Sequence, residues 1–274
     1  MATEKFARVG HFKSPAEFRS HLGSLNVDLP LDDHILTAPE SPLAAPIDFN
    51  SIPIGNRFCI HPMEGWDAEP DGNPSEYTLK RWQNFGLSGA KLIWGGEAVA
   101  VHHNGRANPN QLLINPQNLP ALENLRHQLI EAHRQNDSGT DDLVVGLQLT
   151  HSGRFCRPNH KDRLEPRIAY AHPVLDARFH IDPETALLGD DDLRRIIDCF
   201  IAAAEMAHRI GFDFVDIKHC HGYLGHELLG AFTREGDFGG SFENRTRFLR
   251  DIVEGIRAKV PDLTLAIRLS AFDT

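Results

Sequence analysis

The sequence has few of the features that mark secreted, membrane-bound or cluster-binding proteins. Its four cysteines lie far apart and form no CxxC pair, which argues against a disulfide framework and against a sulfur-ligated cluster. No segment approaches roughly 18 consecutive apolar residues, and the beginning, MATEKFARVGHFKSP, lacks the apolar stretch of a signal peptide. We therefore expect a cytoplasmic protein.

Positive charge is scarce as well. With 28 Lys and Arg against 38 Asp and Glu, the formal net charge is −10, and no basic run occurs along the 274 residues. This balance argues against nucleic acid and against an anionic membrane as partners. The expected partner is a small-molecule substrate; the oligomeric state stays open, and a homo-oligomer is compatible with the sequence.

The chain divides by pattern into an extension and one α/β domain. Residues 1–50 are Pro-rich and weakly periodic, so we expect an N-terminal extension that wraps a domain over 51–274. In that domain, short apolar runs typical of buried strands alternate with segments of helical periodicity. The predicted strands are 57–63, 91–101, 142–151, 212–219 and 264–270.

Cap residues locate the predicted helices. Asn73 precedes Pro74 and a helix that runs to Gly89, and a weaker helix is expected over about 118–134. Asp190 and Asp191 precede the strongest amphipathic pattern, which ends before Gly211, and Ser241 caps a helix at about 242–259. The connection over 152–189 reads as a long loop that is too polar to be core.

Strict alternation of strands and helices predicts a parallel sheet covered by helices on both faces. No GxGxxG or GxxxxGK[ST] motif follows the first strand, so the dinucleotide-binding and P-loop folds lose support. The leading fold is a (β/α)8 TIM-type barrel with its active site at the carboxyl ends of the strands. Only five units are present, so the barrel is expected to be truncated after the fifth strand.

The stretch IKHCHGYLGHELL raises the question of a metal site. His219 and His221 form an H-x-H pair, which would place both side chains on one face of a strand, with His226 nearby. In metal-dependent amidohydrolase barrels such a pair closes the first strand, whereas here it closes the fourth. Since 16 histidines also make a chance pair common, we expect no metal.

The same stretch also suits redox or oxyanion chemistry. Lys218, His221 and Tyr223 would lie at the barrel mouth, where donors suit an electron-rich ring or a developing oxyanion. Tyr223 is a candidate general acid. The residues alone leave open that these are ordinary solvated side chains at a strand end.

A family resemblance decides between these interpretations. HGYLGHELL, followed by FGGSFENRTRFLRDIV, closely resembles the Old Yellow Enzyme family of FMN-dependent oxidoreductases. RFCIHPM, LIWGGEAVAV, GLQLTHSGR and AIRLSAFD resemble further motifs of that family in the same order, over about 50–274. The resemblance implies bound FMN and NADH or NADPH as reductant.

Five positions would contact the cofactor if the resemblance holds. It implies that Pro62 and Met63 lie against the flavin and that Ala98 touches the ring. Gln148 would hydrogen-bond the pyrimidine edge. Arg268 would lie near N1 and the C2 carbonyl, where a fixed cation stabilises the anionic reduced flavin.

The substrate positions depart from the family pattern. Lys218 and His221 match the pair that binds the activating group of the substrate, but the first is usually histidine. The added charge is expected to favour a carboxylate or a more acidic substrate. Tyr223 matches the proton donor, Trp66 replaces a substrate-contacting tyrosine, and Glu64 replaces a Cys or Thr near the flavin C4 carbonyl.

The resemblance therefore implies NAD(P)H-driven reduction of an activated C=C bond on FMN. An alternative is a flavin-dependent dehydrogenase or demethylase of N-methyl amines on the same barrel. A third is an inactive fragment, because the family grips the FMN phosphate with loops after strands seven and eight and the chain stops at Thr274. The sequence leaves open the substrate, the choice of NADH or NADPH, and any iron–sulfur or second domain in a longer parent chain.

Overall fold

The computed structural model describes residues 7–136 and 139–270, which form two compact units divided between Ala45 and Pro46. In the first unit, helix α1 (Pro15–Ser24) begins after Ser14, whose hydroxyl accepts a hydrogen bond from the Glu17 backbone N–H at 3.2 Å. The second unit contains the sheet and the candidate site. The extension over 1–50 stays a prediction.

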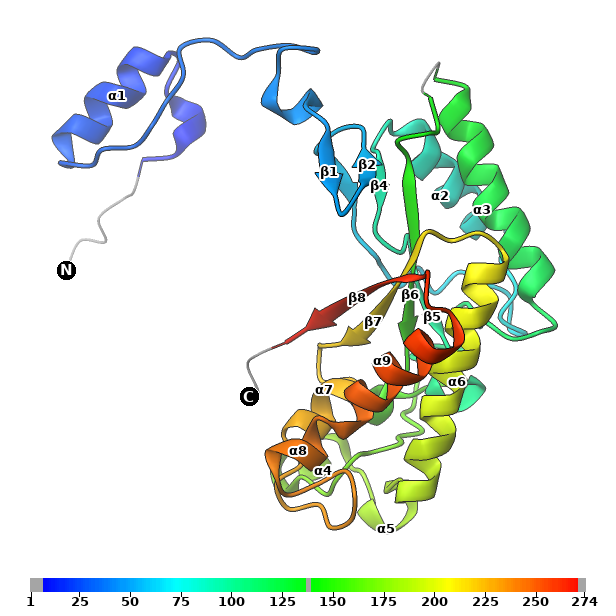
Figure 1. The fold of residues 1–274 in the computed structure, drawn as a ribbon. Coiled ribbons are helices and arrows are strands. Elements are labelled where there is room, and N and C mark those ends of the chain that lie inside the picture. Colours follow the sequence, from blue (N-terminus) through cyan, green and yellow to red (C-terminus); the bar gives the residue numbers. More distant parts are fainter. Residues whose placement is uncertain (1–6, 137–138, 271–274) are drawn as a thin grey trace. The chain divides into compact units, whose positions relative to one another are not determined.

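The second unit is built on a parallel sheet (Figure 1). Its strands run in the order β3-β4-β6-β7-β8, with β5 also paired to β6. Neighbours in space follow chain order, as in consecutive units of a barrel, and β3 and β8 are the two ends of this path among the described residues. The strands are β3 Cys59–Ile60, β4 Leu92–Ile93, β5 Ala98–Ala100, β6 Val144–Thr150, β7 Phe214–His219 and β8 Thr264–Leu269.

Two strands stand apart as an antiparallel hairpin. β1 (Ile47–Phe49) and β2 (Ile52–Ile54) are joined by Asn50 and Ser51, which both have positive φ, 51° and 68°. Two successive residues with positive φ are typical of the tight turns that fit hairpin twist.

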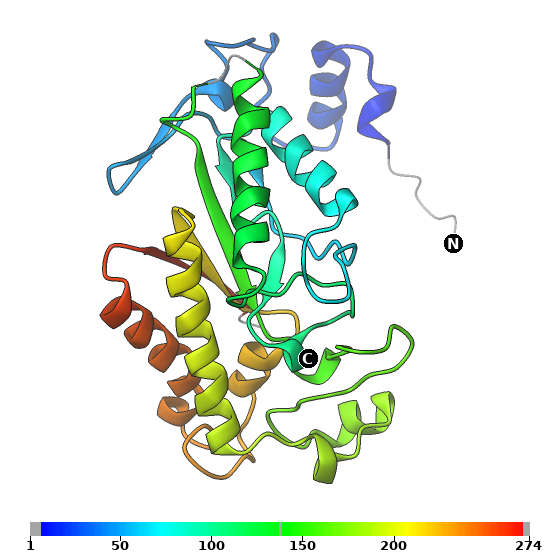
Figure 2. The same cartoon turned by 90° about the vertical axis from the view of Figure 1, so that its right-hand side faces the viewer.

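The helices cover one face of the sheet. Figures 1 and 2 show α2, α3, α6 and α9 together on the same side of the strands. The prediction that helices cover both faces is therefore wrong, because a barrel keeps its helices outside and its polar site inside. The helices of this unit are α2 Glu76–Leu87, α3 Leu119–Arg134, α4 Pro173–Phe179, α5 Pro183–Ala186, α6 Asp190–Arg209, α7 Leu224–Leu229, α8 Phe242–Arg245 and α9 Arg247–Lys259. No helix among the described residues is long and apolar enough to cross a membrane.

Most predicted elements are confirmed, with local corrections. The helix beginning after Asn73 instead begins after Ser75, which forms a capping box with Thr78. The predicted strand 91–101 is split into β4 and β5, because Gly95 and Gly96 both have positive φ, 82° and 46°. The helix after Ser241 is divided between α8 and α9.

The connection over 152–189 is also more ordered than predicted. It contains α4, α5 and the short 3-10 turn Gly153–Phe155, and it buries Cys156, Ile168 and Ala169 completely. The prediction that this segment is too polar to be core is wrong, since its polar residue Arg154 is itself buried with ionic partners.

Alternation along the strands separates a core face from an inner face. Leu147, Leu149, Val215 and Ile217 belong to the large apolar cluster formed with the helices. On the inner face a small apolar cluster contains Val144 and Phe214, the first residues of β6 and β7, together with Ile54 of the hairpin. Polar residues follow on the same face toward the carboxyl ends: Gln148, Asp216, Lys218 and Arg268.

Candidate active site

A cavity of about 300 Å³ lies on this inner face at the carboxyl ends of the strands. All eight residues that the sequence assigned to catalysis or cofactor binding line it. Glu64, which the sequence placed near the flavin C4 carbonyl, lines it as well. Trp66 does not line the cavity, but its indole N–H donates to Glu64 Oε2 at 3.2 Å. The lining residues are Pro62, Met63, Glu64, Ala98, Gln148, Lys218, His221, Tyr223 and Arg268.

Gln148 is held in one orientation by the neighbouring strand. Its Nε2 donates to Asp216 Oδ2 at 2.5 Å, and the two residues lie directly opposite each other in the β6–β7 register. Asp216 is fully buried, and burial raises the pKa of its carboxyl although the Gln148 hydrogen bond opposes this. With the amide nitrogen engaged, the carbonyl oxygen of Gln148 is the atom that can accept a hydrogen bond from a ligand.

Three donors converge on the carboxylate of Glu64. Lys218 Nζ forms an ion pair with Oε1, while the Tyr223 hydroxyl donates to Oε2 at 2.8 Å and the Trp66 indole shares that oxygen. The Lys218 ammonium also lies 3.9 Å from the centroid of the Tyr223 ring. The positive charge expected from Lys218 therefore has an anionic partner within the site.

The protonation states of Tyr223 and His221 follow from their surroundings. Burial, reinforced by the Glu64 carboxylate, raises the pKa of Tyr223, so the phenol keeps its proton. Burial, with the charges of Lys218 and Arg268, lowers the pKa of His221, so the imidazole is neutral near pH 7. The site thus presents a neutral imidazole and a protonated phenol.

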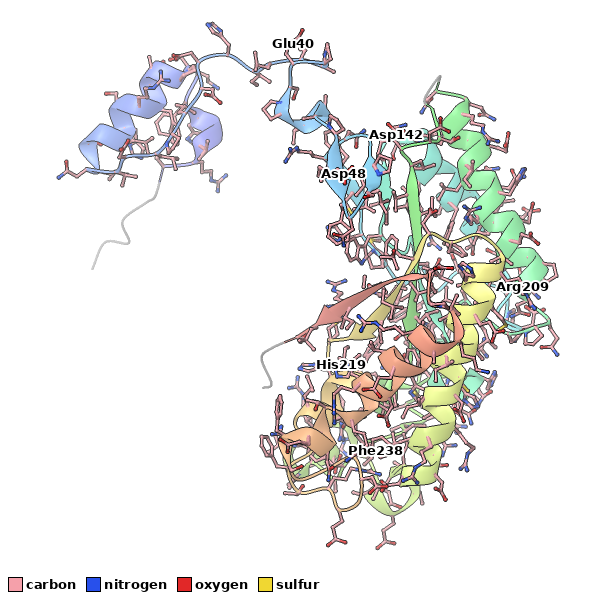
Figure 3. The ribbon with its side chains drawn as sticks, in the orientation of Figure 1. Glu40, Asp48, Asp142, Arg209, His219 and Phe238 are labelled. Carbon is pink, nitrogen blue, oxygen red and sulfur yellow. The ribbon has the colours of Figure 1, made fainter. Side chains whose placement is uncertain are left out.

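The two histidines of the H-x-H pair do not share a strand face. His219, labelled in Figure 3, is the last residue of β7 and is 1 % exposed. His221 follows in a turn with a positive φ of 63°, so the prediction that both point from one face is wrong. Burial lowers the pKa of His219 to about 3. In the part of the chain that the structure describes, no group of three or more His, Cys, Asp or Glu side chains could hold a metal ion.

An ionic network around the buried carboxylate of Glu97, which the sequence did not predict, supports the loop carrying Glu64. Glu97 is fully buried, accepts the Gly65 backbone N–H at 3.1 Å and pairs with Arg81 at 2.6 Å. Arg81 also binds Asp67 through two hydrogen bonds of 2.8 and 2.9 Å. A Cβ at Gly65 would lie 1.9 Å from a guanidinium nitrogen of Arg81, so a larger residue here would displace Arg81 from its position. The sign of this network in the sequence was an isolated acidic residue, Glu97, directly after two glycines that interrupt an apolar run.

Glu97 predicts a pH-dependent contribution to stability. Burial raises its pKa to about 7 although Arg81 opposes the shift, whereas the unfolded value is 4.5. The folded state therefore holds this proton more tightly, and the stabilisation is lost as the pH rises from about 4.5 to 7. We expect urea unfolding between pH 5 and 8 to show a smaller fall in stability for Glu97→Gln than for the wild-type chain. Glu205→Gln, an exposed change on α6, should lose as much unfolding free energy over this pH range as the wild-type chain. An equal loss in all three proteins would contradict the assignment to Glu97.

A second buried network lies beside Tyr223. Arg154, with its side chain 1 % exposed, pairs with Asp176 and Glu227. Glu227 also accepts the Ala169 backbone N–H at 3.0 Å, which ties the 152–189 segment to α7. The next residue, Phe155, packs against the Tyr223 ring with centroids 6.2 Å apart. This network therefore supports one wall of the cavity.

Comparison with known proteins identifies the family. The model of the NADH:flavin oxidoreductase / NADH oxidase family matches residues 42–274. The chain belongs to this family. FMN with NADH or NADPH as reductant is the cofactor chemistry of the family, and the resemblance to the Old Yellow Enzymes in the sequence is confirmed.

Relatives show how much of the family fold is present. The chain is 28 % identical over 251 residues to an NADH:flavin oxidoreductase of Gibberella zeae, covering 86 % of this chain and 58 % of the relative. It is 29 % identical over 238 residues to an NADPH dehydrogenase of Bacillus subtilis, covering 84 % and 64 %. The Old Yellow Enzyme structure from a Pichia species superposes with a TM-score of 0.67 at 19 % identity, covering 86 % of this chain and 61 % of that one. The chain thus spans about three fifths of these relatives, and the predicted fold is confirmed: the first five units of a (β/α)8 barrel, with the sheet not closed.

Proposed function

We propose that this chain provides the flavin-ring and substrate contacts of an FMN-dependent NAD(P)H oxidoreductase that reduces an activated C=C bond. The observation that carries the proposal is the single cavity at the carboxyl ends of five strands, which collects all eight residues that the family resemblance assigned to cofactor and catalysis. These residues come from segments more than 200 positions apart, so chance clustering of strand-end polar groups does not explain the set.

The donor set of the cavity fits a flavin ring. Gln148 offers a carbonyl oxygen, since its amide nitrogen is engaged by Asp216. Arg268 adds a guanidinium on β8, where it lies opposite Lys218, two positions beyond the Asp216–Ala266 pair toward the carboxyl end. A planar amide and a fixed cation suit a ring edge that has both N–H and C=O groups and gains negative charge on reduction. Pro62, Met63 and Ala98 supply apolar contact for the ring itself.

The remaining groups fit the reduction of an unsaturated carbonyl compound. Bound FMN supplies hydride transfer between NAD(P)H and the substrate. His221, as a neutral imidazole, donates a hydrogen bond to the carbonyl that activates the double bond. Tyr223, which keeps its proton, delivers that proton to the carbon opposite hydride addition.

Titration of the 274-residue chain with FMN tests the cofactor part of the proposal. We expect saturable quenching of flavin fluorescence and a dissociation constant that rises about tenfold or more in Arg268→Ala, since a charged hydrogen bond contributes roughly 1.5–3 kcal/mol. Arg257→Ala, an exposed change on α9, should bind FMN like the wild-type chain. Absence of saturable binding, or equal affinities in all three chains, would contradict the assignment.

Half-reactions of the flavin-loaded chain test the substrate class. An α,β-unsaturated ketone should reoxidise the reduced flavin in anaerobic stopped-flow absorbance, whereas an N-methyl amine should not reduce the oxidised flavin. The opposite pattern would favour an amine dehydrogenase and overturn the alkene assignment.

A further inference from the structure

The carboxylate of Glu64 is the most heavily bonded group at the cavity. It accepts the Lys218 ammonium on one oxygen and the Tyr223 hydroxyl and Trp66 indole on the other. The side chains of Lys218 and Glu64 are only 5 % and 12 % exposed, so solvent screens this ion pair weakly. Both side chains nevertheless line the cavity, where a ligand would meet them.

The ion pair changes what Lys218 offers to a ligand. A lone ammonium at this position would attract a carboxylate, whereas a paired ammonium has its charge offset by an anion in direct contact. A carboxylate ligand would have to displace Glu64 from Lys218 and would then lie beside a second, partly buried carboxylate, which is costly. A neutral carbonyl compound bound through His221 has no such cost.

Glu64 is also prevented from moving away. The following residue, Gly65, donates its backbone N–H to Glu97, and Glu97 is held by Arg81. Trp66, with a positive φ of 50°, closes the turn and returns its indole N–H to Glu64. The Glu97 network therefore holds the backbone of the loop, while Lys218 and Tyr223 hold the Glu64 side chain.

We propose that Glu64 is a specificity-determining residue: it neutralises Lys218, so that the cavity accepts a neutral carbonyl compound in preference to a carboxylate. This proposal rests on the proposed function, because it names the substrate class of the same site. It reverses the expectation from the sequence alone, which assigned Lys218 to a carboxylate or more acidic substrate.

Three ligands of nearly equal shape test the proposal: benzoate, benzamide and benzamidinium, which are anionic, neutral and cationic. Their affinities are measured by calorimetry for the wild-type chain, Glu64→Gln, Lys218→Met and the double variant, with and without FMN. We expect Glu64→Gln to bind benzoate at least tenfold tighter than the wild-type chain, with benzamide little changed. Lys218→Met should instead gain affinity for benzamidinium, because Glu64 is left without its cation.

The double variant identifies the charge that is responsible. If the benzoate gain depends on Lys218, it disappears in Glu64→Gln/Lys218→Met, while Arg268 is present in all four proteins and cannot explain the difference. Glu205→Gln, exposed on α6, is the matched control and should leave all three affinities unchanged. Circular dichroism checks that each variant is folded. If Glu64→Gln does not fold, the benzamidinium affinity of Lys218→Met tests the proposal instead.

Two results would overturn the proposal. One is benzoate binding Glu64→Gln no tighter than the wild-type chain, or not at all; the other is a gain that persists in the double variant. The ligand affinities are also measured without FMN, so the charge effect is tested independently of flavin binding. A failure to bind FMN would contradict the proposed function, whereas absence of the charge effect would contradict only the role of Glu64.

Discussion

An Arg154→Met chain is expected to lose about 3–5 kcal/mol of unfolding free energy relative to the wild-type chain, because the change leaves buried carboxylates without their cation. Arg154 donates from Nε to Glu227 at 2.7 Å and from Nη2 to the Tyr170 carbonyl at 3.0 Å, and it pairs with Asp176. Burial already raises the pKa of Glu227 to about 7 although Arg154 opposes the shift. Removal of the guanidinium removes this opposition.

Urea unfolding followed by tryptophan fluorescence measures the loss in the relevant unit, since Trp66, Trp82 and Trp94 all lie beyond Pro46. Arg209→Met is the matched control. Arg209, labelled in Figure 3, is exposed near the end of α6, and its replacement should change the unfolding free energy by less than about 0.5 kcal/mol. A loss in Arg154→Met no larger than in Arg209→Met would show that the network contributes little.

A Tyr223→Phe chain is expected to reduce an α,β-unsaturated ketone about 10²–10⁴-fold more slowly, because it lacks the proton donor. Reduction of the flavin by NADPH should change little, since that step needs no proton from Tyr223. Anaerobic stopped-flow absorbance separates the two half-reactions.

The hydroxyl of Tyr223 also donates to Glu64, so its loss could act by disturbing the ion pair. Glu64→Gln provides the comparison, because it changes the charge of the partner and keeps the phenol. Tyr77→Phe, at a position 78 % exposed on α2, controls for the substitution itself. If Tyr223→Phe slowed both half-reactions equally, the phenol would not be the proton donor.

Individual site residues were predictable where a motif gave their strand and position. Gln148 in GLQLTHSGR and Arg268 in AIRLSAFD both lie at strand ends, and the parallel order of the sheet brings them to one cavity. Arg154 ends the motif GLQLTHSGR and Glu97 stands in LIWGGEAVAV. Their roles depend on Arg81, Asp67, Asp176 and Glu227, which periodicity does not connect to them. A buried ion pair leaves no pattern of its own in the sequence.

The sequence by itself determined the class of the fold and the edge of the sheet where the chemistry lies. Strand and helix periods, turn glycines and the order of the motifs are local properties, and a parallel sheet brings strand ends together whatever the details of packing. Only the tertiary structure decided the charge of the site. Glu64 and Lys218 are 154 positions apart, and their ion pair depends on how two strand ends meet. The electrostatic effect of a charged side chain depends on its partner and its burial, and neither is a property of the residue alone.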